Sequence, residues 1–183
     1  MILLTTSRRP TGRTRTFCRD LAGALPDVVR VNRGKMSLDG VAEKAIEVEA
    51  DRVVLVERWH GGPGKINFYR LGSSGLESVS PLMLIRGIRL RREINEATRG
   101  NRSSAVTLQS EHSPELQKVA ECLSEFFSLP VLSLDEAAQK HSVSMHFLLD
   151  SNRRLQITFM QLQRMVEIGP RVTLSKLVWG VQS

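Results

Sequence analysis

The sequence MILLTTSRRPTGRTR, residues 1–15, decides the fold of this chain. Its apolar run Ile2, Leu3 and Leu4 has no helical periodicity and ends in three hydroxyl-bearing residues, which predicts a buried strand. Four arginines follow within eight residues, namely Arg8, Arg9, Arg13 and Arg15. Pro10 and Gly12 lie among them, so we expect this segment to form a basic loop.

The residues after the loop predict a helix. Phe17, Leu21 and Leu25 fall at helical spacing, so we expect a helix over residues 15–25 with Thr14 as its N-cap. Helix N-termini attract anions, and guanidinium groups bind phosphate bidentately. The loop lacks the glycine spacing of a nucleotide-binding cradle. We therefore interpret it as a phosphate-contacting surface, with RNA as the favoured ligand.

Short apolar runs alternate with helical patterns along the rest of the first half. Strands are expected at 28–31, 53–59, 65–71, 76–80 and 82–92, with Pro81 separating the last two. A helix capped by Ser37 is expected over residues 37–50. The polar segment 95–103 is the expected boundary between an N-terminal half, 1–93, and a C-terminal half, 94–183.

The second half restarts the same order of elements. Strands are expected at 105–108, 130–132, 142–149, 155–160 and 172–179. Ser113 and Pro114 predict the start of an amphipathic helix, residues 135–139 predict one helical turn, and residues 161–167 fit either a strand or a helix. Because both halves begin strand–helix–strand, the pattern predicts an α/β chain with two similar halves.

The charge balance favours an anionic partner. The net charge is +7, the isoelectric point is near 10.1, and arginine outnumbers lysine 20 to 6. A genome that prefers arginine would give the same ratio, but it would not explain the clustering of the arginines.

No apolar run reaches the ~18 residues of a membrane span, and no signal peptide is visible. Cys18 and Cys122 are expected to be core thiols.

No residue pattern predicts catalysis or a cofactor. The segment 60–65, HGGPGK, lacks both the preceding glycine and the following Ser or Thr of a phosphate loop, so a turn between strands is favoured. His141 and His146 are five residues apart, which suits neither a helix face nor a strand face, and no metal site is expected. We therefore expect a protein that is not an enzyme.

The predicted RNA contacts lie in expected turns or at strand ends. They are Ser7, Arg8, Arg9, Arg13, Arg15, Arg33, Lys35, Arg86, Arg89, Arg91, Arg92, Arg153, Arg154 and Arg171. Any one arginine is more often simply solvated, but strand ends of α/β sheets gather at two edges, so several clusters are expected to converge on one surface. Trp59, Tyr69, Trp179 and the six phenylalanines lie mostly on core-like positions, which disfavours base stacking and favours backbone and shape contacts.

Three segments resemble the Brix-domain family of ribosome-biogenesis proteins. They are Thr5-Thr6-Ser7-Arg8-Arg9-Pro10, Val31-Asn32-Arg33-Gly34-Lys35 and Glu167-Ile168-Gly169-Pro170-Arg171. The resemblance covers essentially the whole chain, which is similar to the bare, Imp-like Brix domains of archaea. It implies two structurally similar α/β halves, each a mixed sheet with helices resembling the anticodon-binding domain of class IIa aminoacyl-tRNA synthetases. Residues 158–164 depart from the family by being less basic, which weakens the case for an RNA contact there.

The resemblance also implies a function. Family members act in the assembly and processing of pre-ribosomal RNA, so the implied partners are ribosomal RNA or small guide RNA and pre-ribosomal proteins, without a membrane, cofactor or small-molecule substrate. The implied location is the cytoplasm in an archaeon and the nucleolus in eukaryotic relatives. An alternative hypothesis is a protein–protein adaptor within a pre-ribosomal particle, in which the basic loop meets an acidic partner.

Overall fold

The computed structural model describes residues 1–94, 102–110 and 113–180. Most of the expected connector, residues 95–101, lies outside this range. Two compact units are present: a first unit of Met1–Ala22, Asp27–Ile85 and the chain from Lys176, and a second unit of Gly23–Pro26 and Arg86–Ser175. The halves expected from the sequence, 1–93 and 94–183, remain a prediction.

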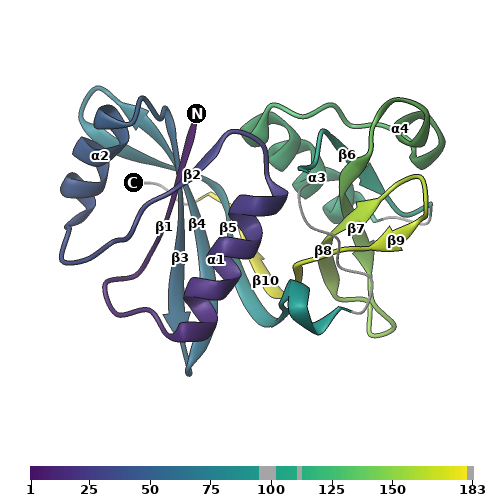
Figure 1. The fold of residues 1–183 in the computed structure, drawn as a ribbon, viewed down its shortest axis with the longest axis horizontal. Helices are drawn as coiled ribbons and strands as arrows, with labels where there is room; N and C mark the ends of the chain where they lie inside the picture. The colour runs from purple at the N-terminus through teal and green to yellow at the C-terminus, as the bar shows by residue number, and fades with distance from the viewer. Residues whose placement is uncertain (95–101, 111–112, 181–183) are drawn as a thin grey trace. The chain divides into compact units, whose positions relative to one another are not determined.

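The first unit is built around the strand that opens the chain. Its strands are β1 (Ile2–Thr6), β2 (Val28–Arg30), β3 (Arg52–Trp59), β4 (Gly62–Gly72) and most of β5 (Gly75–Arg89), in the sheet order β2-β1-β3-β4-β5. β1 is parallel to β2 and β3, whereas β3, β4 and β5 are antiparallel. The helices α1 (Gly12–Ala24) and α2 (Leu38–Glu47) lie on opposite faces of these strands (Figure 1).

The predicted burial of β1 is confirmed, because all five of its residues are buried. Leu3 packs with Val41 and Ala45 of α2 and with Val53 of β3 in one hydrophobic cluster. This strand is covered on both faces, as expected for a parallel strand between two crossover helices. Its position fixes where the basic loop leaves the sheet.

Two expectations for the first unit are wrong. α1 begins at Gly12 instead of Arg15, because the Thr14 backbone N–H donates to Thr11 Oγ1 at 3.2 Å, so Thr11 caps the helix. The strands expected on either side of Pro81 are one strand, β5, followed by a short 3₁₀ helix at Arg91–Glu93. The register of β4 with β5 shifts between Ile66 and Phe68, and such a bulge tolerates a proline that cannot donate to the ladder.

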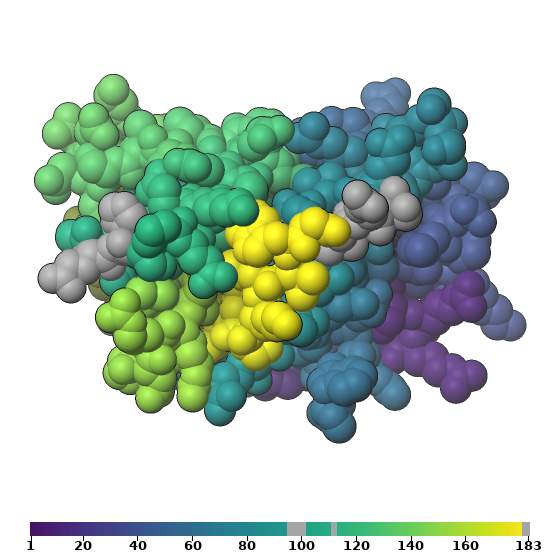
Figure 2. Space-filling model, turned by 180° about the vertical axis from the view of Figure 1, so that it is seen from behind, coloured from purple at the N-terminus to yellow at the C-terminus, as the bar shows by residue number. Residues whose placement is uncertain are grey.

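The second unit contains β6 (Ala105–Leu108), α3 (Pro114–Phe127), α4 (Leu134–Lys140), β7 (Val143–Leu149), β8 (Leu155–Gln161), β9 (Val166–Glu167) and most of β10 (Arg171–Val178). The strand order is β10-β8-β7-β6, with β9 paired to β8. Figure 2 shows this unit from behind, with the green α3 and α4 segments above the yellow-green segment that holds β8 and β9. The capping of α3 by Ser113 with Pro114 in its first turn is confirmed.

Two expectations for the second unit need correction. Residues 130–132 form only an isolated parallel bridge between Val131 and Val106 instead of a strand. The expected single helical turn is α4, which extends over seven residues because Ser133 and Glu136 form a capping box. The segment 161–167, which fitted either a strand or a helix, contains the last residue of β8, a turn at 162–165 and the short strand β9.

The strand orders of the two units correspond. β1 lies between parallel β2 and β3, and β6 lies between the parallel Val131 bridge and parallel β7. In each unit two antiparallel strands follow, β4 and β5 in the first and β8 and β10 in the second. Equivalent positions in the two units can therefore be compared.

A buried polar network links the two parallel strands of the second unit. Thr107 Oγ1 lies 2.8 Å from Ser144 Oγ and 2.9 Å from His146 Nδ1. His146 is buried, and burial lowers the pKa of its imidazole below the ordinary value of 6.5. The folded chain therefore holds this histidine neutral.

We expect the stability of the chain to fall with acidification below about pH 6.5, because His146 takes up its proton at a higher pH in the unfolded than in the folded state. The loss cannot exceed about 1.4 kcal/mol at pH 5.5, which is the limit for a histidine that stays neutral in the folded state. His146→Gln keeps a hydrogen-bonding group and should reduce this loss of stability. The measurement is the free energy of unfolding by urea at about pH 7.5 and about pH 5.5. His60 is exposed, so His60→Gln is the control and should leave the loss of stability unchanged. If His146→Gln loses as much stability on acidification as the native protein, His146 is not the cause of the pH dependence.

Candidate nucleic-acid interface

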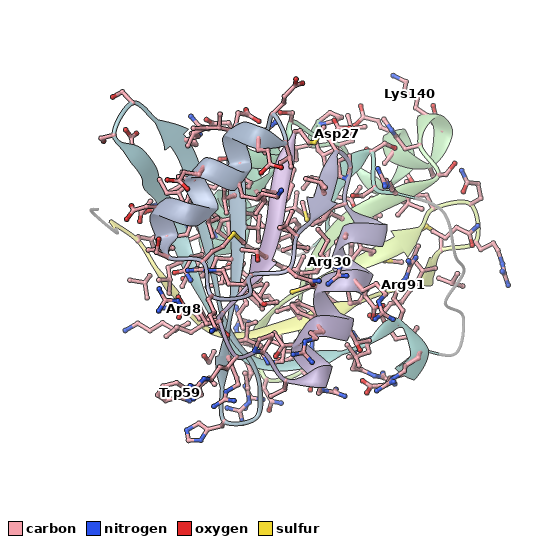
Figure 3. All side chains as sticks on the ribbon, turned by 60° about the vertical axis from the view of Figure 1, so that its left-hand side comes forward. Arg8, Asp27, Arg30, Trp59, Arg91 and Lys140 are labelled. Carbon is pink, nitrogen blue, oxygen red and sulfur yellow. The ribbon has the colours of Figure 1, made fainter. Side chains whose placement is uncertain are left out.

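A pocket of about 430 Å³ lies at the carboxyl ends of β1 and β2 in the first unit. It is lined by Thr6, Arg8, Pro10, Arg15, Arg19, Arg30, Val31, Asn32, Arg33 and Gly34. Five of these ten residues are arginines and none is acidic. Figure 3 shows Arg30 at the end of its strand, next to helix α1. We call this site the arginine pocket; the carboxyl ends of parallel strands are where open α/β sheets commonly bind ligands.

Short backbone contacts hold the walls of the arginine pocket together. The Val31 N–H donates to the Leu4 carbonyl at 2.9 Å, and Thr5 Oγ1 donates to the Val31 carbonyl at 2.9 Å. The turn that follows β2 needs a positive φ of 54° at Gly34, a conformation that glycine adopts without strain. This turn brings the segment after β2 against the loop after β1.

Arg8 and Arg33 are oriented by one carbonyl oxygen. Arg33 Nε donates to Met36 O at 2.8 Å, and Arg8 Nε donates to the same oxygen at 3.3 Å. Arg33 is only 6% exposed, and burial together with the neighbouring Arg8 lowers the pKa of its guanidinium. Among the described residues, none of the five pocket arginines forms an ion pair with a carboxylate. Within the described part of the chain, the positive charge of the site is therefore not neutralised by a direct ion pair, although the Glu57 carboxylate attracts the Arg33 guanidinium through space.

The N-terminus of α1 adds to this positive charge. Its first turn contains Arg13 and Arg15 and no acidic residue. A cation at the positive end of a helix dipole is unfavourable, whereas an anion there is stabilised. The local sequence therefore disfavours the empty site and favours an anion-bound one.

A second hollow of about 520 Å³ adjoins the arginine pocket, because Arg8 and Arg33 line both. Its other lining residues are Ser7, Leu38, Leu55 and Glu57. The Ser7 hydroxyl is buried and has no hydrogen-bond partner. Glu57 is already held by Lys65 at 2.9 Å and Asn67 at 3.1 Å, so it does not neutralise the pocket arginines by direct pairing.

Four predicted contact residues meet in these two hollows, namely Ser7, Arg8, Arg15 and Arg33. Arg9 and Lys35 belong to the same loops and Arg13 lies in the first turn of α1, but these three residues do not line the hollows. Arg19 and Arg30 were not among the predicted contacts. Arg19 lies four residues after Arg15, on the same helix face, a signal present in the sequence. Arg30 joins the pocket through the parallel pairing of β2 with β1, which sequence alone does not reveal.

The other predicted contacts belong to the second unit, namely Arg86, Arg89, Arg91, Arg92, Arg153, Arg154 and Arg171. Two of them bind carbonyls of the same unit: Arg89 Nη2 donates to Glu93 O at 2.9 Å, and Arg91 Nε donates to Ile168 O at 3.4 Å. That all the clusters converge on one surface stays a prediction.

Arg171 is engaged in a two-point ion pair with Glu167. Its Nε donates to Oε1 at 2.6 Å, its Nη2 pairs with Oε2, and Thr158 Oγ1 donates to Oε1 at 2.6 Å. Burial alone would raise the pKa of Glu167, but these hydrogen bonds hold it below the ordinary value, and the same pairing raises the pKa of Arg171. We therefore assign Arg171 no place in the arginine pocket.

The phenylalanines follow the expectation of core positions, whereas Trp59 does not. All six phenylalanines are buried, Tyr69 and Trp179 are half-buried, and Trp59 is 68% exposed. The expectation of a core position is wrong for Trp59, because the β3–β4 hairpin extends beyond the pairing of β3 with β1, which ends at Val56. Within the described ranges there is no group of three or more potential metal ligands, and no helix there is long and apolar enough to span a membrane.

Comparison with known proteins identifies the relatives of the chain. No family model matches it. A probable Brix domain-containing ribosomal biogenesis protein of Methanopyrus kandleri is 29% identical over 180 residues, covering 91% of this chain and 89% of that protein. Proteins of the same description from Aeropyrum pernix and Thermococcus kodakarensis are 37% and 35% identical over 90 and 94 residues. The chain is a homologue of archaeal Brix domain-containing ribosomal biogenesis proteins.

The extent of the match differs among these Brix-domain relatives. The chain spans about half the length of the Aeropyrum and Thermococcus proteins, 50% and 45%. The solved structure of a probable ribosomal biogenesis protein from Aeropyrum pernix matches with a TM-score of 0.77 and 26% identity over 97% of this chain and 98% of that one. Mil, an archaeal Imp4-like protein, matches with a TM-score of 0.66 and 26% identity, covering 97% and 99%. These relatives are named for ribosome biogenesis, and their names describe no enzyme.

Proposed function

We propose that the chain is a non-catalytic ribosome-biogenesis factor that assists the assembly and processing of pre-ribosomal RNA by binding the RNA backbone. The observation that carries this proposal is the arginine pocket, where five arginines meet without a carboxylate and Arg33 is buried without an ion pair. Guanidinium forks match phosphate oxygens, and a polyanion supplies several phosphates at once. Ribosomal RNA is the anion that the homologues' role makes available.

The proposal includes further features that agree with the resemblance. We propose that the two units are structurally similar to each other and to the anticodon-binding domain of class IIa aminoacyl-tRNA synthetases, which their corresponding strand orders support. Small guide RNA and pre-ribosomal proteins are proposed as further partners. In an archaeal cell this role would be cytoplasmic.

A salt series tests the proposal. Log affinity for ribosomal RNA fragments should fall linearly with log salt, with a slope that reflects several phosphate contacts. Arg15→Gln combined with Arg19→Gln removes two exposed pocket charges from α1 and should reduce the magnitude of the slope by about 1 to 2. The measurement is equilibrium RNA binding by filter retention at increasing salt.

Arg52→Gln is the matched control for this experiment. Arg52 is also an arginine of the first unit, but it lies at the opposite end of β3 and pairs with Asp51 at 3.2 Å. Its replacement should leave the slope unchanged. Folded native protein that binds with a flat slope, or variants that all behave like Arg52→Gln, would contradict the assignment of the arginine pocket as the RNA site.

A second candidate function, protein–protein adaptor, is favoured by a different pocket. The second unit has a hollow of about 470 Å³ at the carboxyl end of β6, the position that corresponds to the arginine pocket. Among the described residues that line it none is basic and Asp135 is the one charged residue, and Val131 and Met165 are exposed. Met165→Asp that loses a pre-ribosomal protein in a pull-down while RNA affinity is retained would support the adaptor hypothesis.

A further inference from the structure

Trp59 is presented at the tip of the β3–β4 hairpin of the first unit. β3 ends at Trp59 and β4 begins at Gly62, and this tip projects at the lower edge of the first unit in Figures 1 and 2. The indole meets the His60 ring edge to face, with the ring centroids 4.9 Å apart at 88°. A large aromatic surface is thus left in solvent, while all six phenylalanines of the chain are buried.

The hairpin tip is held in place instead of extending freely. Arg58 Nη1 donates to the Arg9 carbonyl at 3.4 Å, which ties the tip to the basic loop. His60 and Gly61 have positive φ values of 42° and 83°, which close the turn. A Cβ on Gly64 would overlap Trp59 Cβ, so a glycine is needed there for Trp59 to lie against β4. The indole is therefore positioned before any ligand arrives.

The hairpin tip is connected to the basic loop. Arg58, next to Trp59, bonds the Arg9 carbonyl, and Arg8, the residue before Arg9, lines both hollows of the interface. Figure 3 shows Trp59 projecting at the same side of the first unit as Arg8. A protein partner of an exposed tryptophan would normally offer apolar surface, whereas an exposed aromatic ring on a hairpin that is tied to an arginine-rich loop suits a nucleotide, which has both a π face and a phosphate.

We propose that Trp59 is a stacking platform for an unpaired nucleobase whose neighbouring phosphates occupy the arginine pocket. This inference rests on the proposed RNA-binding function and narrows its ligand to RNA with a single-stranded segment. A base inside a duplex is stacked on both faces and cannot cover the indole, whereas a splayed base can. The site therefore distinguishes loops, bulges and ends from continuous helices.

Binding of two RNA probes tests the platform. The probes are a single-stranded oligoribonucleotide of about ten nucleotides, within the usual span of single-strand sites, and a blunt duplex of the same length. Trp59→Ala should weaken single-strand binding roughly 5- to 100-fold and leave duplex binding and the salt slope unchanged, because stacking carries no charge. Trp59→Phe keeps an aromatic face and should restore most of the affinity. Single-stranded RNA should quench indole fluorescence of the native protein, and Trp59→Ala should lose that quenching.

The outcomes separate this inference from the proposed function. If the native protein binds neither probe, the proposed function fails and the platform with it. If Trp59→Ala binds both probes like the native protein, with the salt slope intact, the platform is overturned while the RNA-binding function stands. Equal weakening toward both probes also overturns the platform. If light scattering shows self-association that Trp59→Ala abolishes without changing RNA affinity, the indole is a contact between copies of this chain and the platform is overturned. Circular dichroism confirms that each variant is folded.

Discussion

Replacing Arg33 with methionine is expected to weaken RNA binding by about 10- to 100-fold while leaving the fold as stable as before or more stable. The expected loss corresponds to a charge-assisted hydrogen bond to phosphate, worth about 1.5–3 kcal/mol. Stability should not fall, because Arg33 is a buried cation and no carboxylate among the described residues forms an ion pair with it. The desolvation of Arg33 and its repulsion from Arg8 both oppose folding. The Met36 carbonyl keeps Arg8 as a donor when Arg33 Nε is removed.

Two measurements on the same protein check the Arg33 prediction: urea unfolding for stability and filter retention for RNA affinity. Arg30→Met is the matched control, because Arg30 lines the same pocket but is exposed and donates to Asn32 Oδ1 at 3.2 Å. It should weaken RNA binding without a gain in stability. An Arg33→Met protein that unfolds more easily and binds RNA normally would show that Arg33 is structural, and the pocket would lose its central residue.

The opposite effects of Arg33 on folding and binding distinguish it from the arginines of the second unit. Arg171 is satisfied by Glu167 and Thr158, so its charge is used within the fold. Arg33 donates to one carbonyl, and among the described residues no carboxylate pairs with it. Both residues lie in segments that resemble the Brix-domain family, but of the two only Arg171 is held by a two-point pair with a carboxylate, so we expect Arg33 rather than Arg171 to bind a ligand.

Local patterns in the sequence predicted local structure well. The short apolar run Ile2–Thr6 and the Ser113 cap of α3 depend on neighbouring residues only, and both are confirmed. The start of α1 was misplaced because Thr11 and Thr14 are both acceptable caps, and only the Thr11 hydroxyl accepts the helix N–H. β5 was divided at Pro81 because the bulge that accommodates the proline depends on the partner strand β4.

The candidate site depends more heavily on contacts distant in sequence. Ser7, Arg8, Arg15 and Arg33 were predicted from their clustering in loops. Arg30 enters the pocket through the register that pairs Leu4 with Arg30 across two parallel strands. Trp59 was misplaced because β3 reads as almost continuously apolar up to Glu57, and the sequence does not show that β3 extends beyond its pairing with β1 at Val56.

The largest stability effect is expected at Gly169, in the segment Glu167-Ile168-Gly169-Pro170-Arg171. Gly169 has a φ of 62°, and a Cβ there would overlap the Ile94 Cδ1 methyl of the same unit. Gly169→Ala should lower the free energy of unfolding by about 2–4 kcal/mol, of which about 1 kcal/mol is left-handed backbone strain and the rest is the displacement of buried Ile94. Urea unfolding measures the change.

Gly34→Ala separates the two contributions. Gly34 has a similar φ of 54°, but no atom lies within 4 Å of the position that a Cβ would take, so this variant should lose only the strain of about 1 kcal/mol. The double variant Gly169→Ala with Ile94→Val trims the overlapping methyl and should recover part of the loss. If Gly169→Ala costs no more than Gly34→Ala, the contact with Ile94 is not what requires glycine. A larger loss at Gly169 would mean that the glycine of this motif is required for packing inside the second unit. Gly34, in contrast, would be required only for the backbone turn beside the arginine pocket.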